Sequence, residues 1–307
     1  MYQTDSGAKI LTMSTSKTSP KPTILIAGAT GATGRIATKL LLEKDFPVRA
    51  LVHNEDERSN KLKAQGAEIV VGDLLDFRAV RRAFEGVKRA YFVYPIRPGL
   101  VEATANYGQA ALEANAEFIV NMSQRTARRD SPSDSALHHW LAERIFDRAG
   151  TPVAHLRPTF FTDWLLYVRK AIREGRYAIP FGPVGRFAPI ASEDQAAVIA
   201  AILADPMPHK GQTYQLFGPV ELTQPEIAAI ISKTLGKEVR HEQITARQWA
   251  EELKGSDIPY LSQSIHWITL DHRDGKMTGT NDLVEKIGGR RPMTVAEFVE
   301  KHRAAFE

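Results

Sequence analysis

The sequence contains no cysteine among its 307 residues, which excludes disulfide bonds, thiolate catalysis and zinc sites with cysteine ligands. It also has no apolar run close to the roughly 18 residues that a membrane-spanning helix needs, and no apolar core of a secretory signal precedes Thr23. We therefore expect a cytoplasmic protein that makes no contact with a membrane.

Three catalytic motifs are absent as well. No tyrosine is followed four residues later by lysine, so the Tyr-Lys pair that delivers a proton in many carbonyl reductases is missing. The chain has neither G-x-x-x-x-G-K-[ST] nor G-x-S-x-G, which argues against an ATPase and an α/β-hydrolase. Any reaction of this protein must therefore use other residues.

Positive and negative residues are mixed along most of the chain. The formal net charge is +4, and basic residues are interleaved with acidic ones except at Arg125, Arg128, Arg129 and the pair Arg290 and Arg291. Such a scatter is typical of a solvated surface, so nucleic-acid binding is not expected. Residues 1–20 are rich in serine, threonine and lysine, which predicts a disordered tail.

The stretch KPTILIAGATGATGRIATKLLL, residues 21–42, predicts a strand, a tight turn and a helix in that order. Its glycines are Gly28, Gly31 and Gly34. Glycine lets the backbone reverse sharply and approach a pyrophosphate, and the following helix directs unpaired N–H groups at the phosphates. The pattern alone also occurs in purely structural turns, but the strand before it and the helix after it favour nucleotide binding.

Strands and helices alternate after this unit. We predict further strands at Val48–Val52, Glu68–Val71, Arg89–Val93, Glu117–Asn121 and Pro152–Arg157, with helices between them at 77–84, 100–114 and 133–149. This alternation predicts an α/β fold, a Rossmann-type doubly wound parallel sheet over residues 21–160. Asp76 is expected to cap the helix that begins at Phe77.

The alternation loosens after residue 160, and we expect residues 161–307 to form a smaller α+β substrate lobe intertwined with the first domain. The predicted elements are a helix over 161–175, a loop over 177–189 that lines a cleft, a helix over 192–204 capped by Ser192, strands over 212–216 and 239–244, a helix over 223–236, and helices from about Ala246 and Val295.

The end of the second strand decides the choice of cofactor. An acid there would bind both ribose hydroxyls of NAD, whereas a cation would favour the 2′-phosphate of NADP. The position holds His53, and Arg58 follows shortly after, so NADP(H) is preferred with NAD(H) as the alternative. The acids in the same loop leave this choice open. Asp73 lies at the end of the third strand, where it could hold the adenine amino group.

The polar residues expected to face the cofactor cleft are Tyr94, Ser123, His139 and Thr159. His139 and Glu143 lie four apart on one helical face, where the carboxylate could orient or charge the imidazole for catalysis. The alternative is a surface histidine paired with Glu143. A metal site would need a third ligand that the spacing does not supply, so no metal is predicted.

The ordered set of later segments resembles the NmrA-like family of atypical short-chain dehydrogenases, in its branch of quinone, azo-dye and triphenylmethane-dye reductases. The similarity covers residues 22–302 and rests on GATGATG, GDLLD, HHWLAERIFDRAG, LRPTFF, FAPIASEDQAAVIAAIL, GQTYQLFGPVELTQPEIAAIISKTLGK and GGRRPMTVAEFVEKH. The resemblance implies a dinucleotide cofactor, without flavin or metal.

The resemblance also implies roles for individual residues. His53 stands where many members have an arginine that grips the 2′-phosphate. His139 stands where plant-type reductases have a catalytic lysine and quinone reductase-like members tend to have histidine. The residues expected to bind the cofactor, besides His53 and Arg58, are Gly28, Thr30, Gly31, Ala32, Thr33 and Gly34 in the phosphate loop, Asp73 and Leu74 on the adenine side, and Pro158, Thr159 and Phe160 after the sixth strand.

Two functions remain open at this stage. The first is an NAD(P)H-dependent reductase that transfers hydride to a flat conjugated acceptor, which needs less proton assistance than a ketone. The walls of its pocket could come from Phe160, Phe161, Trp164, Tyr177 and Phe181, which could equally be ordinary core residues. The second is a non-catalytic redox sensor that acts through a protein partner docked on the arginine-rich loop at 125–129. Either would be a monomer or a homodimer.

Overall fold

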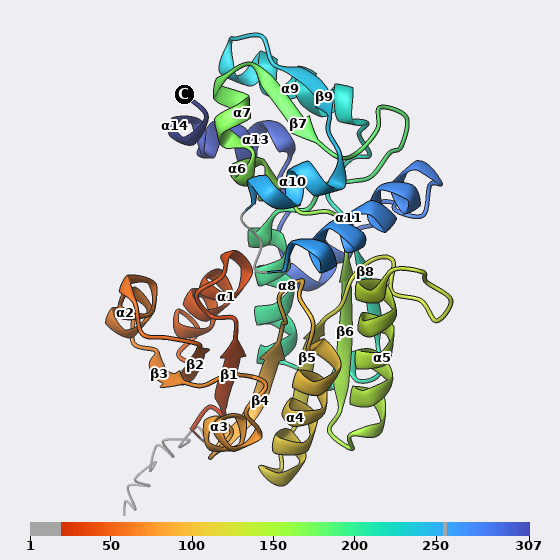
Figure 1. Ribbon diagram of the computed structural model, residues 1–307. Helices are drawn as coiled ribbons and strands as arrows, with labels where there is room; N and C mark the ends of the chain where they lie inside the picture. Colours follow the sequence, from red (N-terminus) through yellow and green to blue (C-terminus); the bar gives the residue numbers. More distant parts are fainter. Residues whose placement is uncertain (1–19, 254–256) are drawn as a thin grey trace, which may run out of the picture.

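A computed structural model describes residues 20–253 and 257–307 of the chain (Figure 1). The predicted disordered tail lies outside the described residues except for Pro20. No helix in the described ranges is long and apolar enough to cross a bilayer.

A seven-stranded sheet forms the larger part of the molecule, and every neighbouring pair of its strands runs parallel. The strand order is β3-β2-β1-β4-β5-β6-β8. Their bounds are β1 Thr23–Ala27, β2 Val48–Val52, β3 Glu68–Val71, β4 Val87–Phe92, β5 Phe118–Met122, β6 Val153–Pro158 and β8 Thr213–Leu216. The predicted doubly wound parallel sheet is confirmed.

Helices cover both faces of the sheet. On one face α1 packs along α8, with α2 and α12 beside them, and on the other α4 packs between α3 and α5. Each face of the sheet has its own hydrophobic core, and alternate residues of β1 point into one or the other. Ile24 and Ile26 face α1 and α8, while Leu25 and Ala27 face α3 and α4. The bounds are α1 Ala32–Leu42, α2 Glu57–Ala64, α3 Phe77–Ala83, α4 Leu100–Glu113, α5 Asp134–Arg148, α8 Ser192–Ala204 and α12 Leu283–Gly288.

A second lobe lies beyond the carboxyl ends of β1 and β6, whose arrows point towards it in Figure 1. It holds a two-stranded parallel sheet and a separate core around Phe181, Trp249 and Phe298. Its elements are α6 Trp164–Tyr167, α7 Arg169–Arg173, β7 Arg176–Ile179, α9 Gln224–Leu235, β9 Arg240–Gln243, α10 Ala246–Glu252, α11 Ile258–Arg273, α13 Val295–Lys301 and α14 Arg303–Phe306. Between β7 and α9 the chain returns to the large sheet to supply α8 and β8.

Several predicted elements differ from the structure. The predicted helix over 161–175 is two short helices, α6 and α7, and the predicted loop at 177–189 begins inside strand β7. The predicted cap by Ser192 is wrong. Ala191 is the N-cap of α8, Ser192 is its first residue, and the Asp163 carboxylate accepts the Ser192 N–H at 2.8 Å. The cap by Asp76 is confirmed, because its carboxylate accepts the Arg78 N–H at 2.9 Å.

Candidate functional site

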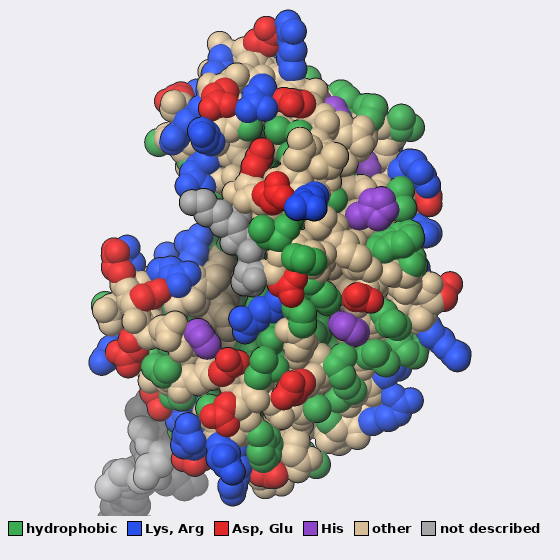
Figure 2. All heavy atoms as spheres, viewed as in Figure 1, with side chains coloured by type: hydrophobic (Ala, Val, Ile, Leu, Met, Phe, Trp, Pro, Cys, Tyr) green, Lys and Arg blue, Asp and Glu red, His purple; other side chains and the backbone are tan. Residues whose placement is uncertain are grey.

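The candidate site lies at the carboxyl ends of the central strands, below the second lobe. Figure 2 shows a hollow on this face between the α1 and α2 side of the sheet and the second lobe. The strand order reverses direction at β1, which has β2 on one side and β4 on the other. In an open parallel sheet such a reversal point is where a crevice for ligands forms.

The turn between β1 and α1 has the geometry of a phosphate cradle. Gly28 has φ +61°, a left-handed conformation that lets the chain reverse directly after the buried strand. Gly31 is the N-cap of α1 and offers no side chain to the first-turn amides, and that turn contains no acidic residue. The N–H groups of Ala32, Thr33 and Gly34 therefore have no acceptor within the helix and favour an anion.

Gly34 has no room for a side chain, and Gly31 has little. A Cβ on Gly34 would lie 2.3 Å from the carbonyl oxygen of Gly28, whereas one on Gly31 would make a tight contact of 3.2 Å with the same atom. The helix can approach the strand this closely because Gly34 lacks a Cβ. This close approach and the unpaired amides fit a dinucleotide pyrophosphate.

The predicted ribose and adenine residues lie together at the ends of β2 and β3. The His53 side chain is 65% exposed, and its Nδ1 lies 3.8 Å from Oδ2 of Asp73. Oδ1 of Asp73 accepts the Leu75 N–H at 2.9 Å, which fixes the carboxylate at the strand end. Arg58 is bound to Asp56, the N-cap of α2, through two side-chain hydrogen bonds of 2.9 and 2.6 Å. Its guanidinium is therefore committed to that helix cap in this structure.

Ser123 lies directly after β5 and belongs to a buried polar network. Its hydroxyl donates to Oε1 of Glu143 at 2.6 Å, and Arg157 donates to both Glu143 oxygens at 2.7 and 2.5 Å. Burial alone would raise the pKa of Glu143, but the hydrogen bonds from Arg157 and Ser123 outweigh it and hold that pKa below its ordinary value. Because the carboxylate is ionised it cannot donate, so the Ser123 hydroxyl donates its only proton to Glu143. Towards any other group Ser123 can act only as an acceptor.

His139 lies one turn before Glu143 on α5 and is 9% exposed. Within the described part of the chain its Nδ1 is buried without a hydrogen-bond partner. Burial lowers the pKa of His139 to about 4, against the raising influence of the Glu143 charge, so the imidazole is neutral near pH 7. A buried lone pair without a partner costs less than a buried N–H, which favours the tautomer with its proton on Nε2.

The expected pairing of His139 with Glu143 is wrong in both of its forms. Glu143 is fully buried and bound to Ser123 and Arg157, so it neither orients the imidazole by a hydrogen bond nor forms a surface pair with it. The two side chains do share the inward face of α5, as the spacing predicts. Arg157, at the end of β6, was not recognised from the sequence. The sequence did carry one signal for it. Glu143 occupies an inward-facing position of a helix, and a buried carboxylate requires a cationic partner.

Other predicted residues are engaged in contacts within the protein. Tyr94 is 5% exposed and its hydroxyl donates to the Pro98 carbonyl at 3.1 Å. The Thr159 hydroxyl donates to the Ala188 carbonyl at 2.5 Å, next to the buried Pro158. Phe160 packs against Phe181 and Trp164 with ring centroids 4.7 and 4.9 Å apart. Tyr177 and Phe181 are also fully buried, which favours core packing for most of the predicted aromatic walls.

Two of the three arginines in the predicted docking loop are tied to the rest of the protein. Arg128 binds Asp271 through two hydrogen bonds, and Arg125 donates to the Thr278 carbonyl at 3.3 Å and stacks over Phe217. Arg129 is the exposed arginine of that loop. Across residues 20–253 and 257–307, no group of three or more histidine or acidic side chains is arranged to hold a metal ion.

The doubly wound sheet, the reversal at β1 and the glycine cradle together define a Rossmann-type dinucleotide-binding protein. More specifically, the chain belongs to the NmrA-like family, whose sequence model matches residues 20–297. The family predicted from the sequence is therefore confirmed.

Three relatives illustrate the similarity. An NAD(P)H azoreductase of Xenophilus azovorans is 32% identical, over 92% of this chain and 99% of the relative. The solved NADPH-dependent quinone oxidoreductase of Escherichia coli, complexed with NADPH, is 25% identical with a TM-score of 0.78, over 91% and 99% of the two chains. The solved triphenylmethane reductase of Citrobacter sp. is 25% identical with a TM-score of 0.77, over 92% and 99%.

Proposed function

We propose that this protein is an NAD(P)H-dependent reductase that delivers hydride to a small, flat, conjugated acceptor of the azo, quinone or triphenylmethane type. The observation that carries the proposal is the 32% identity with an NAD(P)H azoreductase, which extends over nearly the full length of both chains. The cradle at Gly28, Gly31 and Gly34 supports it, because its amides and missing side chains fit the pyrophosphate of such a cofactor.

NADP(H) is the proposed cofactor, with NAD(H) as the alternative. Strand β2 ends at Val52, and the residue that follows it is His53 rather than an acid that would repel a 2′-phosphate. Asp73, which lies near His53, competes with this preference, as do the acids at 55–57 that follow β2. A similar solved structure was crystallised with NADPH. Neither a flavin nor a metal ion is part of the proposal.

The bound nicotinamide supplies the hydride, and the side chains of this protein supply orientation. Ser123, with its proton committed to Glu143, accepts a hydrogen bond and cannot act as the acid. We assign to neutral His139 the donation of a hydrogen bond from Nε2 to the nitrogen or oxygen of the acceptor. A quinone or azo acceptor becomes an anion on hydride addition and takes its proton from water, because conjugation spreads the charge, whereas a cationic triphenylmethane dye becomes neutral and needs no proton.

Steady-state turnover tests the reductase proposal directly. We expect purified protein to oxidise NADPH in the presence of at least one member of a panel of azo dyes, quinones and triphenylmethane dyes. NADPH should give a higher kcat/KM than NADH. Absorbance of the reduced nicotinamide measures the rate, and calorimetry measures cofactor affinity. Tight cofactor binding without turnover of any member of the panel would reject the reductase and favour the sensor.

A His139→Leu variant tests the role given to the imidazole. We expect kcat to fall by about ten- to a hundredfold, since leucine has no N–H group to donate to the developing charge. The wild-type kcat should show no histidine ionisation between about pH 5.5 and 8, because the imidazole stays neutral well above its pKa of about 4. His209→Leu is the control, since His209 bonds Tyr214 in the turn after α8. Unchanged turnover in His139→Leu would remove this residue from the mechanism.

A further inference from the structure

The segment between Ser123 and His139 is held against α11 along its length. Residues 124–133 form neither helix nor strand. A chain segment of this kind has no backbone ladder to fix its position, so side-chain contacts must do so. Ser123 lies at its start, and α5 with His139 begins at its end, where Ser133 caps the helix by accepting the Ala136 N–H.

Contacts with α11 occur at several points, in reverse order along the two segments. The Gln263 side chain donates to the Pro132 carbonyl at 3.1 Å. The His138 ring stacks on Tyr260 and lies 3.2 Å from its hydroxyl through Nδ1. Beyond the end of α11, Arg125 reaches the Thr278 carbonyl. The helix and the turn after it therefore back the segment from Arg125 to His138.

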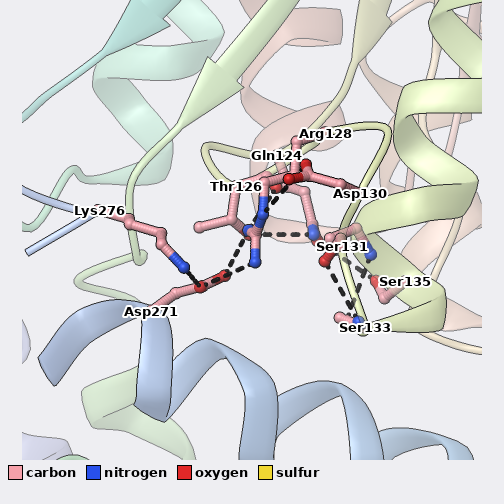
Figure 3. Close-up of polar contacts among 10 residues, drawn as sticks. Gln124, Thr126, Arg128, Asp130, Ser131, Ser133, Ser135, Asp271 and Lys276 are labelled. Carbon is pink, nitrogen blue, oxygen red and sulfur yellow. Dashed lines mark hydrogen bonds and ion pairs between the residues drawn. The ribbon is translucent and has the colours of Figure 1, made fainter. Parts of the chain in front are cut away.

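Midway along these contacts is an ion pair between Arg128 of the loop and Asp271 of α11. Arg128 donates to the two Asp271 oxygens at 2.7 and 3.0 Å, and Lys276 donates to the same carboxylate at 2.9 Å (Figure 3). Asp271 is 4% exposed and the Arg128 side chain 25%. Arg128 also donates to the Thr126 carbonyl at 3.2 Å, so the guanidinium holds the fold of its own loop. A two-pronged contact of this kind fixes both distance and orientation.

The loop has further bonds of its own, but they are longer. Figure 3 shows Gln124 joined to Thr126 and Ser135, at 3.3 Å in each case, and Ser131 joined to Ser133 at 3.2 Å. The bond to Ser135 ties Gln124 to the start of α5, and the Arg125 N–H donates to the Pro158 carbonyl at the end of β6 at 3.1 Å. The middle of the loop is attached through α11, and among the described residues Asp271 supplies the only charged contact of that helix with the loop.

We propose that Asp271 is a positioning residue for the reaction: by holding Arg128 it fixes the segment 124–138, and with it the relative placement of Ser123 and His139. The proposal rests on the proposed function, because hydride transfer is sensitive to displacements of about 1 Å in the groups around the acceptor. Asp271 itself touches neither the phosphate cradle nor the residues at the ends of β2 and β3. It should therefore affect turnover while leaving cofactor affinity unchanged.

An Asp271→Asn variant of the full chain tests this inference. We expect kcat for the acceptor to fall by about tenfold or more, with the Kd for NADPH within about twofold of the wild type. Amide hydrogen exchange over residues 124–138 should accelerate by about tenfold, because the segment opens more often. Arg128→Lys keeps the charge but loses the two-pronged contact, and it should change both quantities in the same direction by less.

Arg49→Met is the matched control for general destabilisation. Arg49 is also mostly buried, and it donates to Glu68 and to the carbonyls of Ala83 and Glu85 near the amino ends of β2 and β3. If Arg49→Met lowers the thermal stability as much as Asp271→Asn does, it should still leave kcat and the amide hydrogen exchange of residues 124–138 unchanged.

Two results would overturn the role of Asp271: a kcat in Asp271→Asn no lower than in Arg49→Met, or unchanged exchange over 124–138. The failure of the proposed function is a separate result, namely that the wild type reduces no acceptor. In that case the exchange measurement still decides whether Asp271 fixes the segment.

Discussion

A Gly34→Ala variant is expected to lose dinucleotide binding. The added Cβ would lie 2.3 Å from the Gly28 carbonyl oxygen, 2.9 Å from its carbonyl carbon and 3.0 Å from the Cα of Ala29. All three atoms belong to the backbone, so no side chain can rotate away. The start of α1 must instead move off the end of β1, which displaces the amides that face the pyrophosphate. We expect the Kd for NADPH to rise by about a hundredfold or more, equivalent to about 3 kcal/mol.

Calorimetric titration with NADPH measures this loss, and Gly236→Ala is the control. Gly236 has φ +69° at the end of α9, and a Cβ there would meet nothing within 4 Å. Its substitution should cost about 1 kcal/mol of stability through backbone strain without changing cofactor affinity. If Gly34→Ala binds NADPH as tightly as Gly236→Ala does, the cradle is not the pyrophosphate site.

The first half of the fold was predictable because its signals are local. In the stretch from Thr23 to Leu42 the apolar run, the glycines and the amphipathic helix follow one another without interruption, and each agrees with the others. The remaining strands of the sheet up to β6 are short apolar runs between helices of regular length. Their order in the sheet comes from packing between distant segments, which local patterns do not encode.

The second lobe was harder to predict because its elements depend on tertiary contacts. Helix α11 was missed: Ile258–Arg273 includes Pro259 and several polar residues, and it forms against the core and the loop at 124–133. Strand β7 was missed because its partner, β9, lies some sixty residues further along the chain. Ser192 has the type of an N-cap residue, yet Asp163, which is distant in sequence, binds the backbone N–H at that helix start.

The site shows the same division. The spacing of His139 and Glu143 correctly placed both on one face of α5, because helical periodicity fixes the face. It could not identify the partner of Glu143, since Ser123 and Arg157 come from the ends of two different strands. The exposed His53 and the buried Tyr94 looked alike in the sequence, as polar residues at strand ends. Only the packed structure separates them.

Replacing Glu143 by leucine is expected to be among the most destabilising single changes in the protein. Arg157, whose side chain is 19% exposed, would lose the carboxylate that now accepts two of its N–H groups, and Ser123 would lose its acceptor. Removing one partner of a buried ion pair leaves the other charge uncompensated, which costs about 3–5 kcal/mol. Urea denaturation of the two proteins at pH 7 measures the difference in the free energy of unfolding.

The double variant Glu143→Leu with Arg157→Leu separates the stability of the pair from the cost of breaking it. If the single variant is destabilised by the unpaired charge, removing Arg157 as well should recover most of the loss, because apolar groups can replace a buried pair at little cost. Ser123 remains without its acceptor in both variants, so recovery should fall short by about 1 kcal/mol. A double variant no more stable than the single one would mean that the cost lies in lost packing around Glu143.

The pH dependence provides a second measure of the same pair. The pKa of Glu143 is lower in the folded protein than in the unfolded chain, so the unfolded state binds more protons in acid. The contribution of Glu143 is therefore fully present above its unfolded pKa of about 4.5 and is lost as the pH falls through the lower, folded value. The stability difference between the wild type and Glu143→Leu should be constant near neutral pH and shrink in acid. A difference that stays constant down to the lowest pH at which both proteins fold would contradict an ionised Glu143.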